Sequence, residues 1–178
     1  MKRIQYCAVS AILLSAATVH GASYHTVESA QKACFPEGAE FIPVPLTLTK
    51  EQMKAIEKDS GVRVRLSEQK VWRATRNGKP AGWFIVDEVL GKHEFITYAL
   101  ALDAAGGVKS VEVMNYRETY GYEIRNTDWR AQFLGKKHGA RLKLDEDIQN
   151  VSGATLSCRH ITDGVKRLLS LHELVLKK

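Results

Sequence analysis

Alternation of apolar and polar positions identifies a β-rich middle section in this chain. Four stretches between residues 69 and 116 have the two-residue period of half-buried strands. We expect strands at about 69–76, 80–90, 94–103 and 108–116. Asn77-Gly78 joins the first two, because a type I′ turn needs positive φ at both central residues. Gly106-Gly107 joins the last two. Such short connections favour an antiparallel meander.

Two helices are expected before these strands. The first is a short helix over residues 26–35, and the second follows Thr49, which caps it. Gln52 completes a capping box with Thr49, and Gly61 ends the helix. Between the two helices, residues 41–46 hold two prolines and predict an extended connector.

Two further helices are expected after the strands. A short one begins with Asn126 or Thr127 as its cap, turns Trp129 and Phe133 inward and ends at Gly135. Residues 136–150 are polar and predict an irregular segment. The last helix runs from about 157 to 175, and its apolar face comprises Ile161, Val165, Leu168 and Leu169. The sequence therefore predicts an α+β fold, an antiparallel β-meander sheet covered by helices, with a C-terminal helix after the motif SGAT.

The first residues have the pattern of a secretory signal. Lys2 and Arg3 precede an apolar stretch over residues 4–19, and small residues follow, so that Gly21 or Ala22 would be the last residue removed. The apolar stretch is short for a membrane span, which needs roughly 20 residues. We expect residues 1–22 to be a signal peptide and the mature protein to be periplasmic or otherwise exported.

Charge and cysteine content narrow the function classes. Removal of the leader takes away two positive charges and no acids, which lowers the formal charge of the 178-residue chain from +6 to +4. The remaining excess is dispersed along the chain, so nucleic-acid binding is not expected. Cys34 and Cys158 would remain in the exported protein. An oxidising compartment permits a disulfide between them, but spacing leaves both the bonded and the free state open.

The entrance of the last helix concentrates small and hydroxyl residues. Ser152, Gly153, Ala154, Thr155 and Ser157 stand where the helix should begin. Two interpretations compete: the hydroxyls cap the first turn, or an anion binds the free N–H groups at the positive end of the helix dipole. On residue chemistry alone, capping is the more common arrangement.

Other candidate chemistry has weaker support. Cys158 and His160 lie two residues apart on the helix, so their side chains diverge and do not form a nucleophile–base pair. The six histidines are scattered without a metal-binding repeat. The acidic run from Asp145 to Asp147 is typical of a solvated loop.

The motif "SGATLS" after a β-rich segment resembles the signature of the bacterial FMN-binding domain family. This family includes the G subunit of the Rnf electron-transport complex, the C subunit of the sodium-translocating NADH:quinone reductase and small exported proteins. A loop from Glu118 to Gly121 is similar to the family's E-T-x-G loop, which a helix containing Trp129 follows. The resemblance covers about residues 70–170. We therefore divide the chain into the signal peptide, an N-terminal helical segment over 23–65 and an FMN-binding domain over 66–178.

The resemblance implies a cofactor and a set of binding residues. The first four residues of the motif, Ser152 to Thr155, correspond to the family's S/T-G-A-T tetrad. In the family, the threonine that closes this tetrad carries FMN through a phosphoester bond, which makes Thr155 the attachment residue. The other cofactor-binding residues implied are Ser152, Gly153, Ala154, Leu156, Ser157, Glu118, Thr119, Tyr120 and Gly121. The N–H groups of residues 154–157 would bind the phosphate, and the 118–121 loop with Leu156 would form walls for the ring.

The chain departs from the family pattern at three positions. Gln149 stands where an acid usually precedes the tetrad by three residues, with Asp147 two residues earlier. Tyr120 stands where proline is common, and Tyr122 where leucine often occurs. Tyr120 is a candidate to stack on a flavin ring, or it is a surface aromatic.

The implied function is electron transfer. A flavin carries one or two electrons itself, so no general acid or base is required and the protein resembles a relay more than an enzyme. The expected partners are a flavin transferase outside the cytoplasm, which loads FMN, and redox proteins at or near the membrane. The alternative is an exported α+β module that uses the same cleft for a different ligand or for a protein.

Overall fold

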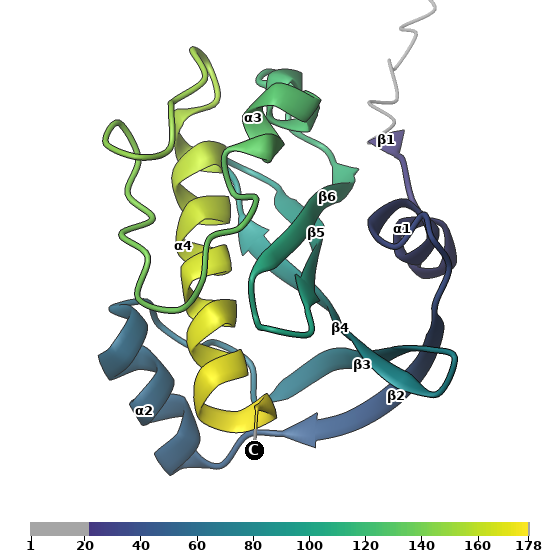
Figure 1. Ribbon diagram of the computed structural model, residues 1–178. Helices are drawn as coiled ribbons and strands as arrows, with labels where there is room; N and C mark the ends of the chain where they lie inside the picture. The colour runs from purple at the N-terminus through teal and green to yellow at the C-terminus, as the bar shows by residue number, and fades with distance from the viewer. Residues whose placement is uncertain (1–21, 178) are drawn as a thin grey trace, which may run out of the picture.

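One antiparallel sheet organises the chain in the computed structural model, which describes residues 22–177 (Figure 1). Its order is β1-β6-β5-β4-β3-β2. The strands are β1 (Ala22–Ser23), β2 (Glu40–Thr47), β3 (Glu68–Arg76), β4 (Lys79–Leu90), β5 (Phe95–Asp103) and β6 (Val108–Tyr116). The predicted four-stranded meander is confirmed as β3 to β6. Asn77 and Gly78 turn the first hairpin with φ of 51° and 72°, as the type I′ prediction requires.

The prediction of a connector at residues 41–46 was wrong, because this segment is the edge strand β2. Pro43 pairs with Trp72 and Pro45 with Lys70 of β3. Residues two apart in a strand direct their backbone nitrogens to the same edge, and here that edge is the outer one, away from β3. No strand pairs with this edge, so the missing proline N–H groups cost no ladder hydrogen bond. The ladder with β3 therefore tolerates both prolines.

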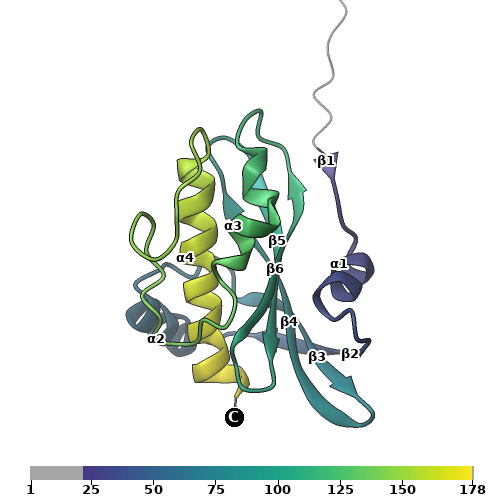
Figure 2. The ribbon, with the colours of Figure 1, turned by 45° about the horizontal axis from the view of Figure 1, so that its top comes forward.

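Helices cover both faces of the sheet (Figure 2). They are α1 (Val27–Cys34), α2 (Lys50–Ser60), η1 (Tyr122–Arg125), α3 (Thr127–Ala131), α4 (Thr155–Leu171) and the π-helical turn η2 (His172–Leu176). Helix α1 lies on one face, and α2, α3 and α4 lie on the other. The predicted capping box of α2 is present, with Thr49 and Gln52 bonded reciprocally and Gly61 in the left-handed conformation at its C-cap.

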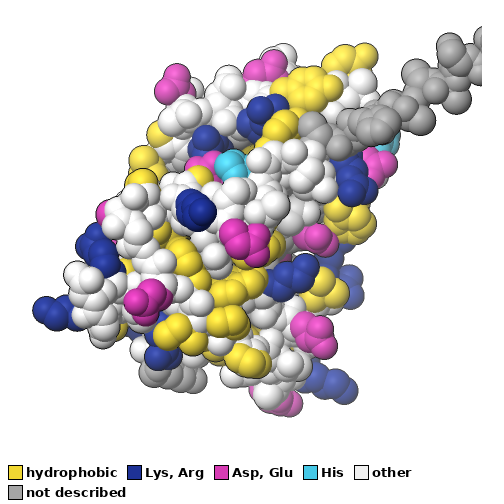
Figure 3. All heavy atoms as spheres, turned by 90° about the vertical axis from the view of Figure 1, so that its right-hand side faces the viewer, with side chains coloured by type: hydrophobic (Ala, Val, Ile, Leu, Met, Phe, Trp, Pro, Cys, Tyr) yellow, Lys and Arg dark blue, Asp and Glu magenta, His cyan; other side chains and the backbone are white. Residues whose placement is uncertain are grey.

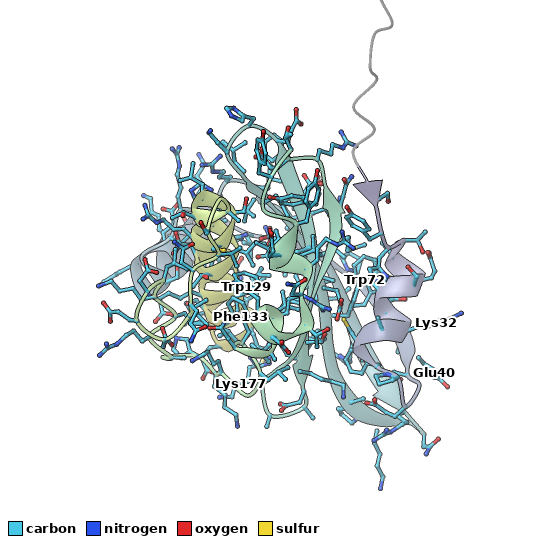
Figure 4. The ribbon with its side chains drawn as sticks, turned by 90° about the horizontal axis from the view of Figure 1, so that it is seen from above. Lys32, Glu40, Trp72, Trp129, Phe133 and Lys177 are labelled. Atoms are coloured by element: carbon cyan, nitrogen blue, oxygen red, sulfur yellow. The ribbon has the colours of Figure 1, made fainter. Side chains whose placement is uncertain are left out.

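Each face has its own hydrophobic core. On the α4 face, Trp129 and Phe133 lie between the helix and the sheet, as predicted (Figure 4). On the other face, Phe84 and Ala74 pack under α1, with Trp72 beside them. α4 is the main cover of the larger core, so the sheet and this helix together fix the position of the motif at its start.

The two cysteines belong to different cores. Cys34 lies in the core under α1 and Cys158 in the core under α4, and both are free and buried. The question left open by the sequence is thereby answered, because the sheet separates the thiols. Burial raises the pKa of Cys34 to about 12 and that of Cys158 to about 11.

The predicted leader lies outside the described residues except for Ala22, which pairs with Tyr116 in β1. Within residues 22–177, none of the helices combines the length and the apolarity that a membrane span needs. On the face shown in Figure 3, basic and acidic side chains are interspersed around apolar ones and form no continuous basic surface.

Candidate functional site

The start of α4 has no side-chain cap. Its N-cap is Ala154, with φ of −123° and ψ of 19°, and no side chain accepts from the first turn. The first intrahelical bond runs from the N–H of Cys158 to the carbonyl of Ala154 at 2.9 Å. The capping interpretation of the hydroxyl residues was therefore wrong. The N–H groups of Thr155, Leu156 and Ser157 lie at the positive end of the helix without an i−4 acceptor.

Thr155 is exposed at this uncapped end. Its Oγ1 accepts a hydrogen bond from Nδ2 of Asn150 at 3.0 Å, which orients the hydroxyl. Gly153, two residues earlier, is exposed with φ of +81° and has open space at its Cα. Ser152 is also exposed, whereas Ser157 is buried. An incoming phosphate therefore has room beside the Thr155 hydroxyl.

The 118–121 loop packs directly on the tetrad. Gly121 adopts φ of +86°, and a Cβ built there would lie 2.4 Å from Cβ of Ala154 and 2.9 Å from the hydroxyl oxygen of Tyr116. That Tyr116 hydroxyl donates to the carbonyl of Tyr120 at 2.5 Å and lies 3.5 Å from Oγ of Ser157. Two motifs more than thirty residues apart in the sequence thus form one surface.

Glu118 is buried and fixes this loop to the β4–β5 turn. Its Oε1 accepts from the backbone N–H groups of His93 at 2.6 Å and Glu94 at 3.1 Å. Burial acts to raise the pKa of Glu118, but the backbone hydrogen bonds from His93, Glu94 and Lys92 outweigh it and lower the pKa. The carboxylate therefore positions the loop, and the neighbouring Thr119 is exposed.

Three exposed apolar side chains come from the two motifs and the segment that follows the loop. The exposed fractions are 75% for Tyr120, 50% for Tyr122 and 39% for Leu156. The ring of Tyr122 meets that of Tyr116 edge to face, with centroids 5.9 Å apart. Exposed aromatic and aliphatic groups of this kind suit a planar ring such as isoalloxazine.

The acid that the family usually has before the tetrad is replaced by Gln149, and the nearby carboxylate of Asp147 is engaged elsewhere. The Gln149 carbonyl accepts from Nε1 of Trp129 at 2.8 Å. Asp147 accepts from Nζ of Lys136 at 2.9 Å and from the N–H of Lys143 at 2.7 Å, so it holds its own loop. Burial opposes the resulting shift, but these contacts lower the pKa of Asp147.

Sequence reasoning missed two contributors, Tyr116 and Asn150. In the sequence, Tyr116 is the last residue of a predicted strand, and Asn150 is a polar residue before a predicted helix. Only the folded arrangement shows that Asn150 contacts Thr155 of the tetrad and that Tyr116 contacts Ser157, two residues after the tetrad. The Cys158–His160 pair does no joint chemistry, because Cys158 is buried and His160 donates from Nδ1 to the Leu90 carbonyl. Within residues 22–177, no group of three acidic, histidine or cysteine side chains could hold a metal ion.

Comparison with known proteins agrees with this geometry. Residues 91–170 match the model of a family described as the FMN-binding domain. The crystal structure of Shewanella oneidensis NqrC has the same fold, with a TM-score of 0.52 and 17% sequence identity over 76% of this chain and 80% of that chain. No curated protein matches the chain. The structural match confirms the predicted α+β fold, and the family match confirms the predicted resemblance and FMN as cofactor.

Proposed function

We propose that the protein is an exported electron-transfer flavoprotein with FMN bonded to Thr155, on the premise that residues 91–170 match the model of the FMN-binding domain. The observation that carries the proposal is the exposed Thr155 hydroxyl at the uncapped start of α4. The 118–121 loop lies against the same tetrad through Gly121 and Ala154. The residues present therefore fit both ends of FMN, the phosphate and the ring.

The bond to Thr155 would be a phosphoester. A flavin transferase would use FMN whose phosphate carries a leaving group. The bond from phosphorus to that group would break as the bond to Oγ1 of Thr155 formed, and the hydroxyl proton would pass to a base of the transferase. Asn150 Nδ2 donates to Oγ1 and so leaves the hydroxyl proton directed away from it. The N–H groups at the first turn then stabilise the remaining phosphate charge. A covalent bond prevents loss of the cofactor outside the cytoplasm.

The ring of FMN would lie against the exposed side chains of Tyr120, Tyr122 and Leu156. The bound flavin supplies one- and two-electron chemistry. The protein holds the ring at an accessible surface, since these three side chains face solvent. This arrangement suits electron relay between protein partners at or near the membrane better than turnover of a small substrate in an enclosed cavity.

Flavin attachment is tested by expressing the full chain with a flavin transferase and viewing a denaturing gel under ultraviolet light. We expect a fluorescent band that is lost in Thr155→Ala. Thr127→Ala is the matched control, because Thr127 is an exposed threonine at the start of α3, and its band should persist. Fluorescence that survives in Thr155→Ala would contradict the attachment site.

Export is tested on the same cells. The leader pattern predicts that the protein in the extracytoplasmic fraction begins at Ala22 or Ser23. Peptide mass analysis of the first residues measures this directly. A chain that keeps Lys2 and Arg3 and stays with the cytoplasmic fraction would contradict export.

A further inference from the structure

The sheet has an incomplete ladder at one end of β4. Pairing of β3 with β4 begins at Lys70 and Val86, while the first two residues of β3, Glu68 and Gln69, pair with β2 alone. Residues 87–90 of β4 pair with β5. On the opposite side these four residues face no strand, so a wedge opens between β4 and the segment that leads into β3.

A cavity of about 510 Å³ occupies this wedge. It extends around the strand edge, because its lining includes consecutive residues of β4, whose side chains point to opposite faces of the sheet. The walls come from the 62–70 segment, the 86–90 portion of β4, Phe95 and the α4 side chains His160, Asp163 and Arg167. The cavity is therefore bounded by an open strand edge.

Backbone groups of Glu88 point into this opening. The N–H of Gly91 donates to the carbonyl of Glu94 across the β4–β5 turn at 2.8 Å, so Gly91 faces β5. The backbone N–H and C=O groups of successive residues point to opposite edges of a strand. Those of Leu90 and Glu88 therefore point away from β5, toward the wedge. The Leu90 carbonyl accepts from His160. The Leu90 N–H and both backbone groups of Glu88 remain for a partner.

The walls around this edge combine apolar and basic groups. Leu66 is 65% exposed and Phe95 is 56% exposed at the cavity. Three cations in the walls have no ion-pair partner among the described residues: Arg63, Arg65 and Lys70.

Two of the four acids in the walls are already engaged. Asp87 is paired with Arg167 at 2.5 Å, and Glu88 accepts from the Thr97 hydroxyl at 3.3 Å. Glu68 and Asp163 remain, and burial raises the pKa of Asp163. A positive excess is therefore confined to the 62–70 wall, where Arg63, Arg65 and Lys70 stand against Glu68 alone. The opposite walls keep the carboxyl groups of Glu88 and Asp163.

We propose that this wedge binds an extended segment of a partner protein as an added strand beside β4. The segment alternates apolar and acidic residues, and it pairs with the backbone of Glu88 and Leu90 while its carboxylates meet the basic 62–70 wall. Strand addition at an open edge derives affinity from main-chain hydrogen bonds and specificity from alternate side chains. A segment that covers residues 87–90 is about 13 Å long. The proposal does not depend on FMN, since none of the flavin-binding residues lines the wedge.

The test uses a capped hexapeptide that alternates glutamate and valine, labelled for fluorescence anisotropy, and a counterpart that alternates lysine and valine. We expect the glutamate peptide to bind the full chain and the lysine peptide to bind at least about tenfold more weakly. Glu88→Pro removes an N–H that faces the wedge without breaking the β5 ladder, and it should weaken binding about tenfold. Glu88→Ala keeps that N–H and is the matched control, with affinity equal to or above that of the original chain, because it removes one carboxylate from the wall.

Amide hydrogen exchange on the original chain keeps the test independent of whether Glu88→Pro folds. Saturating glutamate peptide should slow exchange at the Glu88 and Leu90 amides. Equal affinity of Glu88→Pro and Glu88→Ala, equal binding of both peptides, no binding at millimolar peptide or unchanged exchange at Glu88 would each overturn the proposal. Loss of FMN fluorescence in Thr155→Ala has no bearing on these results.

Discussion

The stability lost on adding a methyl group at Gly121 can be predicted, because the contact between Gly121 and Ala154 joins the 118–121 loop to the tetrad. Alanine at position 121 must adopt φ of +86°, and its Cβ would lie 2.4 Å from Cβ of Ala154. The left-handed conformation costs about 1–2 kcal/mol for a non-glycine residue. Relieving the overlap costs about 1–3 kcal/mol more, since a packed contact must move. We expect Gly121→Ala to lower the free energy of unfolding by about 2–5 kcal/mol.

Gly135→Ala separates these two costs. Gly135 also has positive φ, +72°, but nothing lies within 4 Å of a Cβ built there. Its substitution should cost only the conformational part, about 1–2 kcal/mol. Ala154→Gly removes the opposing methyl group, and glycine is tolerated at an N-cap. Combining it with Gly121→Ala should restore part of the lost stability.

Urea unfolding followed by circular dichroism measures the stability of the original chain, the three single variants and the double variant, and flavin fluorescence on a denaturing gel measures loading. Gly121→Ala should also reduce FMN attachment more than Gly135→Ala does, because it displaces the loop from the tetrad. Equal destabilisation by Gly121→Ala and Gly135→Ala, with no recovery from Ala154→Gly, would refute the packing argument.

Three further predictions concern buried groups. Glu118→Gln should cost about 1–3 kcal/mol at pH 7. Because folding lowers the Glu118 pKa, this contribution is present above about pH 4.3 and is lost as pH falls through the folded pKa, so urea unfolding should show the two proteins converging in acid. Arg167→Met removes the ion pair of Asp87, to which the buried Tyr98 hydroxyl also donates at 2.6 Å, and should cost about 3–5 kcal/mol; recovery is expected when Asp87 is also replaced by asparagine, which keeps an acceptor for that hydroxyl. Cys34 and Cys158 should react with a thiol reagent only after unfolding in urea, and rapid labelling of the native mature protein at pH 8 would contradict their burial.

Local signals in the sequence were sufficient for most of the fold. The Asn77-Gly78 turn and the capping box at Thr49 are short-range features, and the structure contains both. Strand β2 escaped prediction because its prolines oppose strand formation unless the strand is at an edge, and only the complete sheet shows which strands are edges. The separation of Cys34 from Cys158 likewise depends on which face each helix covers.

The site was less accessible to sequence reasoning. The tetrad and the 118–121 loop were recognised as motifs, but their direct contact through Gly121 follows from the fold. Glu118 stays a predicted cofactor residue, and the fold adds that its carboxylate accepts from the 91–94 turn. A single carboxylate in a motif gives no sign of which backbone N–H groups it will accept from, because those groups belong to a different turn.

The two ends of the described chain lie at opposite ends of α4, and this gives the molecule a direction (Figure 1). Ala22 pairs with Tyr116, which reaches Tyr120 and Ser157 at the start of the helix. The C-terminus follows α4 and η2, whose 17 and 5 residues extend about 30 Å from Thr155. With FMN bonded to Thr155 as proposed, a tether at the N-terminus would hold the flavin close to the surface that carries the tether, whereas a tether at the C-terminus would place the flavin about 30 Å from that surface.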